Sequence, residues 1–136
     1  MASYNRERLE GIDSLIVEGI AMLPEIQGYG LFARMTDAVK ENEDLVCLRT
    51  QNPRMYRALE KYCHTVCPGG TNGLKAPLDS LAKYFGNDID SNGVVKGYYG
   101  GLFYGDEPHH EKIDFLFEDL GVDLNNGDAV LAVGLI

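Results

Sequence analysis

The feature that most constrains the fold is an apolar run near the end of the chain, residues 129–133, with the sequence Ala-Val-Leu-Ala-Val. Its hydrophobicity is continuous instead of alternating, which is typical of a fully buried strand. Residues 134–136, Gly-Leu-Ile, extend the run. We therefore expect the end of the chain to be buried against the protein itself or against a partner, and a homo-oligomer joined through this strand is one arrangement that would bury it.

The remaining sequence favours a single α+β domain. Its 136 residues match the usual size of one domain. We expect about five helices and a small sheet formed by the 94–104 region and the C-terminal strand 129–136, with residues 45–48 available as a short edge strand. No run approaches the roughly 18 apolar residues of a membrane span, and residues 1–8 have no apolar stretch behind their charges. We expect a cytoplasmic protein.

Helix expectations rest on apolar residues at three- and four-residue steps, such as Leu9, Ile12, Ile16 and Ile20. Asn52 and Pro53 are a favourable N-cap and first helical residue. The part of the chain from 1 to 85 is thus expected to be mainly helical, and residues 86–136 to form an acidic α/β part. The expected helices span 7–23, 31–40 and 53–66, followed by one from Pro77 to the cap Gly86 and one from Pro108 to Gly121.

Charge is distributed unevenly along the chain. The net charge is −9, and residues 86–136 hold 10 of the 21 acidic residues but only two of the 12 basic ones. A field of one sign repels nucleic-acid phosphates and anionic lipid and attracts cationic proteins. We expect no direct contact with nucleic acid or membrane. The acidic residues form either a solubilising surface or a docking surface for a basic partner.

The most unusual segment is the glycine- and tyrosine-rich stretch at residues 97–105. Glycine lets a backbone approach a ligand closely, and tyrosine offers a flat face with a hydroxyl group. Such a segment suits stacking on a ligand or anchoring an interface, although a distorted hairpin with core aromatics is the simpler structural alternative. It matches neither G-x-G-x-x-G nor the P-loop.

A cysteine–histidine set is the first candidate for metal or thiol chemistry. Cys63 and Cys67 are four residues apart in the expected helix and could form two corners of a zinc site with His109 and His110. A catalytic thiol with His110 and Asn125 is the other reading of this set. Both cysteines also continue an apolar stripe as small buried residues, and the C-terminal end of a helix raises a thiol pKa.

Residues 88–93, Asp-Ile-Asp-Ser-Asn-Gly, match the first half of a calcium loop with Asp88, Asp90 and Asn92 as oxygen ligands. The twelfth position, where a bidentate glutamate is required, is Tyr99. A solvated turn explains the same residues. We therefore predict no metal and no cofactor.

No catalytic set of residues stands out, so the sequence favours a small, acidic, non-catalytic binding protein. An inhibitor or immunity-type protein that covers a cationic surface of a partner protein is one protein of this kind. The aromatic residues would anchor the complex and the acidic ones would steer it. The expected contact residues are Tyr98, Tyr99, Phe103, Tyr104, Asp106, Glu107, Glu111, Glu118 and Asp119.

Two alternatives belong to other classes of protein. The first is a small-molecule or nucleotide sensor in which the tyrosines stack on the ligand and Arg54, Arg57 or Lys75 meets its phosphates. The second is a metal-dependent or thiol enzyme that uses Cys63, Cys67 and the two histidines. A cationic protein and a small molecule are therefore the two kinds of partner we expect.

Overall fold

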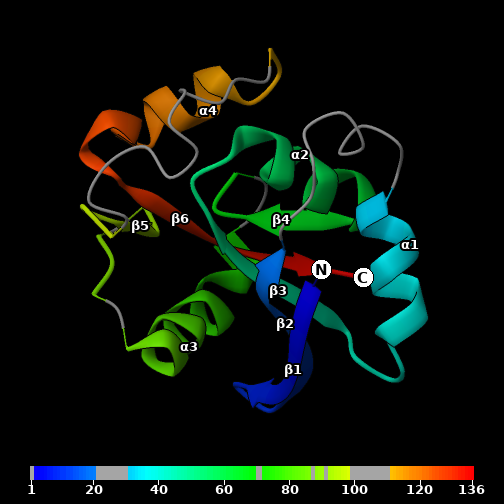
Figure 1. Ribbon diagram of the computed structural model, residues 1–136. Coiled ribbons are helices and arrows are strands. Elements are labelled where there is room, and N and C mark those ends of the chain that lie inside the picture. The colour runs from blue at the N-terminus through cyan, green and yellow to red at the C-terminus, as the bar shows by residue number, and fades with distance from the viewer. Residues whose placement is uncertain (1, 21–30, 70–71, 87, 91, 99–110) are drawn as a thin grey trace.

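The computed structural model describes residues 2–20, 31–69, 72–86, 88–90, 92–98 and 111–136 (Figure 1). Six strands form one mixed sheet in the order β1-β2-β3-β6-β4, and β5 also pairs with β6. Strands β2 and β3 are parallel, whereas β6 runs antiparallel to β3, β4 and β5. The strands are β1 (Ala2–Leu9), β2 (Ile12–Ile20), β3 (Leu45–Thr50), β4 (Thr65–Cys67), β5 (Val94–Val95) and β6 (Ala129–Leu135).

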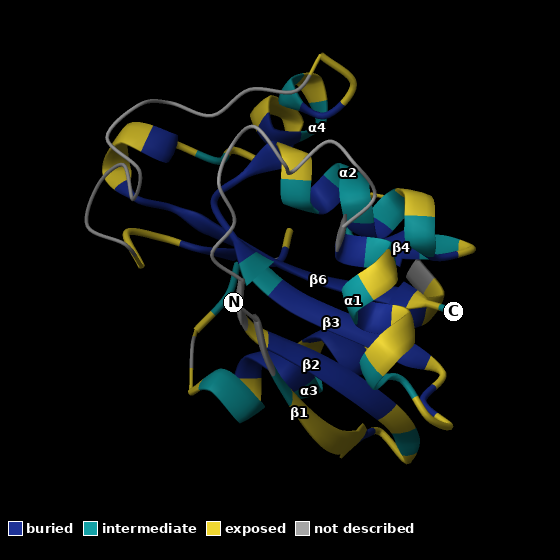
Figure 2. Ribbon diagram, turned by 45° about the vertical axis from the view of Figure 1, so that its right-hand side comes forward, coloured by how far each residue is buried: buried dark blue, intermediate teal, exposed yellow. Residues whose placement is uncertain are grey.

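Helices cover both faces of this sheet. Two separate buried clusters lie on its two sides, one with side chains of α3 and the other with side chains of α1 and α2 and residues of the α4 region. Strand β6 lies between β3 and the β4/β5 edge, and Figure 2 shows it buried along nearly its whole length. The helices are α1 (Leu31–Val39), α2 (Pro53–Tyr62), α3 (Lys75–Phe85) and α4 (Asp114–Asp119), with 3₁₀ turns η2 (Asn72–Leu74) and η3 (Leu124–Asn126).

The expected α+β class and the buried C-terminal strand are confirmed, with a larger sheet and fewer helices than expected. The described residues contain four α-helices instead of about five. Residues 45–48 belong to the interior strand β3 and not to an edge. Of the expected 94–104 hairpin, only Val94 and Val95 form a strand among the described residues, and 99–104 lie outside the description. Expected helices over 31–40 and from Pro77 to Gly86 are found as α1 and α3.

The expected helix over residues 7–23 is wrong, because β1 and β2 form an antiparallel hairpin there. Leu9 pairs with Ile12 across the two-residue turn Glu10-Gly11, and both turn residues have positive φ (52° and 78°). Such a turn matches the twist of the strands that it joins. Four of the six strands lie within residues 1–85, so this part is not mainly helical.

Helix α2 begins as expected but ends four residues early. The side chain of Asn52 accepts a hydrogen bond from the Arg54 amide at 2.9 Å, and Pro53 is the first helical residue. The helix ends at Tyr62, and Cys63 is already extended. Residues Thr65–Cys67 instead form β4, although we expected the helix to continue to Val66. The backbone hydrogen-bonding groups of β4 pair with those of β6.

Replacing Asn52 with alanine is expected to lower the free energy of unfolding by about 1 kcal/mol, because the first turn of α2 loses its side-chain cap. Urea denaturation followed by circular dichroism measures the change. Asn52→Asp is the matched control, since its carboxylate can accept the same bond. An equal loss in both variants would show that the cap contributes little.

Candidate functional site

The parallel strands β2 and β3 stop pairing with each other before either of them ends. Their register runs from Ser14 beside Leu45 to Val17 beside Leu48. Strand β2 nevertheless continues to Ile20 and β3 to Thr50. In open α/β sheets, ligands bind outside the carboxyl ends of parallel strands. The carboxyl ends of β2 and β3 are therefore the first place to look for a ligand site.

Two helices begin at this end of the sheet. Helix α1 follows β2 and α2 follows β3, and the two helices contact each other. The first amides of a helix have no intrahelical acceptor and carry a positive partial charge, so helix N-termini favour anions. In α2 these amides already have acceptors: Pro53 has no amide hydrogen, the Arg54 amide donates to the Asn52 side chain, and the next two amides donate to the Asn52 carbonyl. Each first turn also carries an exposed arginine, Arg34 in α1 and Arg54 in α2. In the sequence, Gly28 and Gly30 precede α1.

A set of polar and aromatic side chains lies beside the carboxyl ends of β2 and β3, on the face of the sheet that α3 covers. The Tyr84 hydroxyl donates to the Glu18 carboxylate and accepts from the Asn5 amide at 2.5 Å. The hydrogen bond to Glu18 is the main cause that raises the Tyr84 pKa. From β3, the Arg49 guanidinium lies 4.2 Å from the ring centroid of Phe85 and 3.9 Å from that of Tyr98.

This stacking fixes a cation at the end of β3 between two aromatic rings. Tyr98, which we expected to be a contact residue, is 40% exposed while it stacks on Arg49. Its ring therefore lies at the surface beside the carboxyl ends of β2 and β3 and not in the core. A ligand or partner that approaches this edge would meet Arg49 and Tyr98 as a stacked pair.

Asp128 organises the chain next to this edge, just before β6. Its fully buried carboxylate accepts hydrogen bonds from the amides of Gly97 and Asp123 at 2.8 Å, from the Asn126 side chain at 2.9 Å and from Lys96 at 3.0 Å. Burial alone would raise the Asp128 pKa, but these donors outweigh it and lower the pKa to about 2. The charged carboxylate joins the residues after β5 to those after α4 and has a structural role.

The other expected contact residues are divided between α4 and the residues outside the description. Glu118 and Asp119 are exposed on α4, and Glu111 is exposed just before it. Phe115, which the sequence analysis did not select, is 71% exposed on the same helix. The residues that lie outside the described part of the chain are Tyr99, Phe103, Tyr104, Asp106, Glu107, His109 and His110.

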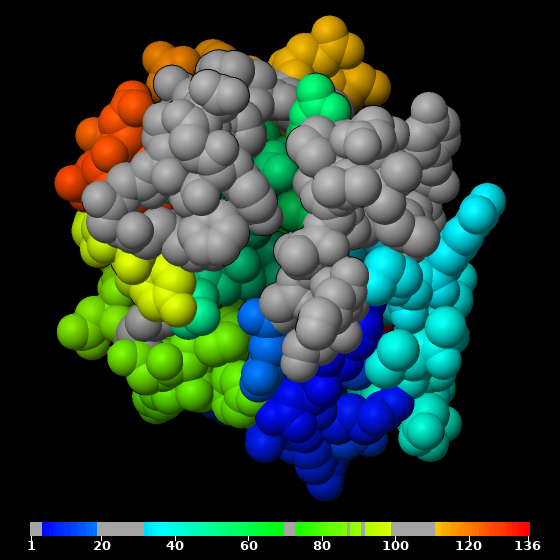
Figure 3. Space-filling model, in the orientation of Figure 1, coloured from blue at the N-terminus to red at the C-terminus, as the bar shows by residue number. Residues whose placement is uncertain are grey.

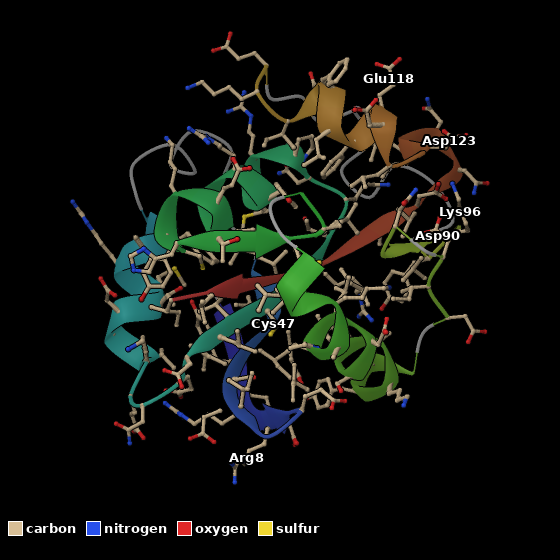
Figure 4. All side chains as sticks on the ribbon, turned by 180° about the vertical axis from the view of Figure 1, so that it is seen from behind. Arg8, Cys47, Asp90, Lys96, Glu118 and Asp123 are labelled. Atoms are coloured by element: carbon tan, nitrogen blue, oxygen red, sulfur yellow. The ribbon has the colours of Figure 1, made fainter. Side chains whose placement is uncertain are left out.

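The cysteines do not share a helix face as expected. Cys63 caps the end of α2, Cys67 lies in β4, and Cys47 lies in β3, in the middle of the molecule (Figure 4). All three thiols are free and buried, and burial raises their pKa values, that of Cys63 to about 12. A nucleophilic cysteine needs a lowered pKa and access to substrate. These thiols pack as small apolar side chains.

The segment that matches half of a calcium loop is held by its own hydrogen bonds. Asp90 accepts from the backbone amides of Asn92 at 2.8 Å and Val94 at 3.1 Å, and the Asn92 side chain donates to the Leu120 carbonyl at 3.2 Å. Asp88 is exposed. Within the described ranges, no group of three or more His, Cys, Asp or Glu is arranged to hold a metal ion.

The expected phosphate-binding cations are not gathered together. Arg57 pairs with Glu60 at 2.7 Å, and Lys75 pairs with Asp79 at 3.0 Å. Each lies within its own helix, α2 or α3. Of the three expected residues, Arg54 therefore has the best position for a phosphate, because it lies in the first turn of a helix.

A pocket of about 430 Å³ lies at the opposite end of β2 and β3. Both arginines of its lining already have partners, since Arg6 pairs with Glu43 at 2.7 Å and Arg8 pairs with Asp13 at 3.2 Å. With four carboxylates beside these two arginines, the lining is net negative and disfavours an anionic ligand. We therefore favour the carboxyl ends of the strands over this pocket. The lining residues are Arg6, Glu7, Arg8, Asp13, Ser14, Glu41, Asn42 and Glu43.

Comparison of the chain with protein-family models, curated proteins and solved structures finds no match. Among the described residues, no helix has the length and apolar character needed to cross a membrane. The fold itself defines the class: an α+β protein whose mixed sheet contains one parallel β-α-β unit, β2-α1-β3.

Proposed function

We propose that this protein binds a phosphate-bearing small molecule, of the nucleotide or nucleotide-coenzyme class, at the carboxyl ends of β2 and β3. The observation that supports this most directly is the parallel β2-α1-β3 unit, whose strands stop pairing at Val17 and Leu48 although both continue. Helix α1 begins at this end of the unit. The geometry suits a ligand that enters between the strands with its anionic group toward the helix.

Charge supports the same class of ligand. Arg34 and Arg54 lie in the first turns of α1 and α2, and Arg49 lies at the end of β3. Most of the net negative charge belongs to the last third of the sequence, where acidic residues have few basic partners. A ligand phosphate at the N-terminus of α1 would thus meet arginine, which binds phosphate through paired hydrogen bonds.

The strand edges indicate a second property of the ligand. Beyond the pair Val17 and Leu48, β2 and β3 are no longer paired with each other. Backbone amides and carbonyls on such an edge pair readily with an extended molecule that contains amide bonds. The ligand panel should therefore include coenzyme A, which combines a diphosphate with amide bonds, beside ATP, NAD and inorganic phosphate.

Thermal denaturation with this panel is expected to show at least one stabilising ligand. A ligand present at about 100 times its Kd adds about 2.7 kcal/mol, which raises the Tm by several degrees in a chain of this size. Arg34→Glu should weaken binding of that ligand about tenfold or more, because it places a negative charge near the phosphate. The same change in free protein is tolerated, since acidic residues suit the first turn of a helix.

Lys40→Glu is the matched control, because it reverses a charge of the same sign just beyond the other end of α1. Binding should change little in this variant. A panel in which no compound shifts the Tm, or in which both variants weaken binding equally, would contradict the proposed site.

A further inference from the structure

Helix α4 packs against the rest of the protein through one face only. Ile113, just before it, and Phe117 are buried, and Phe117 meets the Tyr56 ring edge-on at a centroid distance of 5.9 Å. Leu120, just after the helix, completes the buried face. These residues recur at three- and four-residue steps, and the partly buried Leu116 packs against the same cluster.

Phe115 does not belong to that buried face. It precedes Phe117 by two residues, which directs its side chain to the other side of the helix, and it is 71% exposed. Among the described residues only Tyr98 and Leu135 are other large hydrophobic side chains in the exposed class, and both are much less exposed, at 40% and 37%. A phenylalanine so open to water is not explained by the fold and points to an interface.

The side chains around Phe115 are acidic. Glu118 and Asp119 follow it by three and four residues, which makes them its neighbours on the helix surface, and Glu111 precedes it by four. All three are exposed, and within the described part of the chain none of them takes part in an ion pair. Atoms of the α4 region lie at the top edge of the molecule in Figure 3, and Glu118 and Asp123 point outward in Figure 4.

We propose that the exposed face of α4, made of Phe115, Glu118 and Asp119, docks together with Glu111 just before the helix onto a basic surface of another protein. Phe115 is the apolar anchor and enters a pocket of the partner, and the carboxylates pair with arginines or lysines around that pocket. Aromatic anchors at the centre of an interface carry much of the binding energy, and complementary charges speed and orient association. The docking surface is separate from the ligand site proposed at the ends of β2 and β3.

Fluorescence anisotropy with two labelled peptides tests this proposal. One peptide alternates arginine with leucine, and the other alternates arginine with serine and has the same charge. The protein should bind the leucine peptide about tenfold more tightly than the serine peptide. Phe115→Ser should remove this preference, Phe115→Leu should keep most of it, and roughly 0.5 M salt should weaken both complexes about tenfold or more.

Charge reversal gives the second arm of the test. The double variant Glu118→Lys/Asp119→Lys should weaken binding of both peptides about tenfold. The double variant Glu7→Lys/Asp88→Lys changes the net charge equally on other exposed residues and should have a much smaller effect. Equal effects of the two double variants, an unchanged preference in Phe115→Ser, or binding of neither peptide would overturn the proposal. If the protein self-associates and Phe115→Ser abolishes this self-association, the face binds a second copy of the chain, which would also overturn the proposal.

Discussion

Replacing Asp128 with alanine is expected to lower the free energy of unfolding by about 3 kcal/mol, because four hydrogen-bond donors lose a buried, charged acceptor. The backbone amides of Gly97 and Asp123 contribute most to this loss when they have no acceptor, since the Asp128 side chain is fully buried and water cannot simply replace it. Lys96 is half exposed and can turn to solvent. Urea denaturation measures the change.

Asp88→Ala is the control, because Asp88 is an exposed carboxylate in the same acidic third of the sequence. Its replacement should change the free energy of unfolding by less than about 0.5 kcal/mol. Asp128→Asn should fall between the two, since an amide can accept some of the bonds but carries no charge. A loss of under about 1 kcal/mol in Asp128→Ala would contradict the proposed structural role.

The pH dependence of stability gives an independent measure of the same carboxylate. The pKa of Asp128 is lowered from an ordinary value of 3.8 to about 2 in the folded protein. The charged form is thus favoured by folding, and it contributes about 2 kcal/mol above the unfolded pKa. This contribution is lost as the pH falls from about 4 through 2. The stability difference between the native chain and Asp128→Asn should shrink over that range.

The N-terminal hairpin shows why periodicity alone was insufficient. Leu9, Ile12 and Ile16 fit helical spacing, but β2 is buried on both faces, so Leu15, Ile16 and Val17 are all in the core. A doubly buried strand has no alternation that would distinguish it from a helix. The local signals that favoured a hairpin were Gly11, at a tight turn with positive φ, and the β-branched residues after it.

The end of α2 depended on a partner distant in the sequence. Cys63 and Val66 continue the helical stripe of Leu59, so nothing local ends the helix at Tyr62. The chain leaves the helix because Thr65–Cys67 pairs with β6, about 70 residues later. By contrast, Asn52 and Gly86 were identified correctly, because a cap acts on backbone groups within a few residues of itself.

The candidate site was only partly visible in the sequence for the same reason. The site depends on β2 and β3 being parallel, which is a non-local property that the sequence pattern does not reveal. Arg54 was named from the sequence as a candidate phosphate contact, whereas Arg34 was not. Phe115 could have been found from its position outside the buried stripe of Ile113 and Leu120.

Gly134→Ala is expected to lower the free energy of unfolding by about 2 kcal/mol, because β6 has no room for a side chain at this buried position. An added Cβ would lie 2.4 Å from the Cys63 Sγ, 2.9 Å from the Cys63 Cβ and 3.4 Å from Leu59. In a Cys63→Ala background the sulfur is gone, so the cost of Gly134→Ala should fall by about 1 kcal/mol. Cys47→Ala is the matched background: Cys47 packs in the cluster on the other face of the sheet and should leave the cost of Gly134→Ala unchanged. Urea denaturation of the single and double variants measures the coupling. If both cysteine changes reduce the cost of Gly134→Ala equally, the contact with Cys63 is not the reason why glycine is needed at position 134.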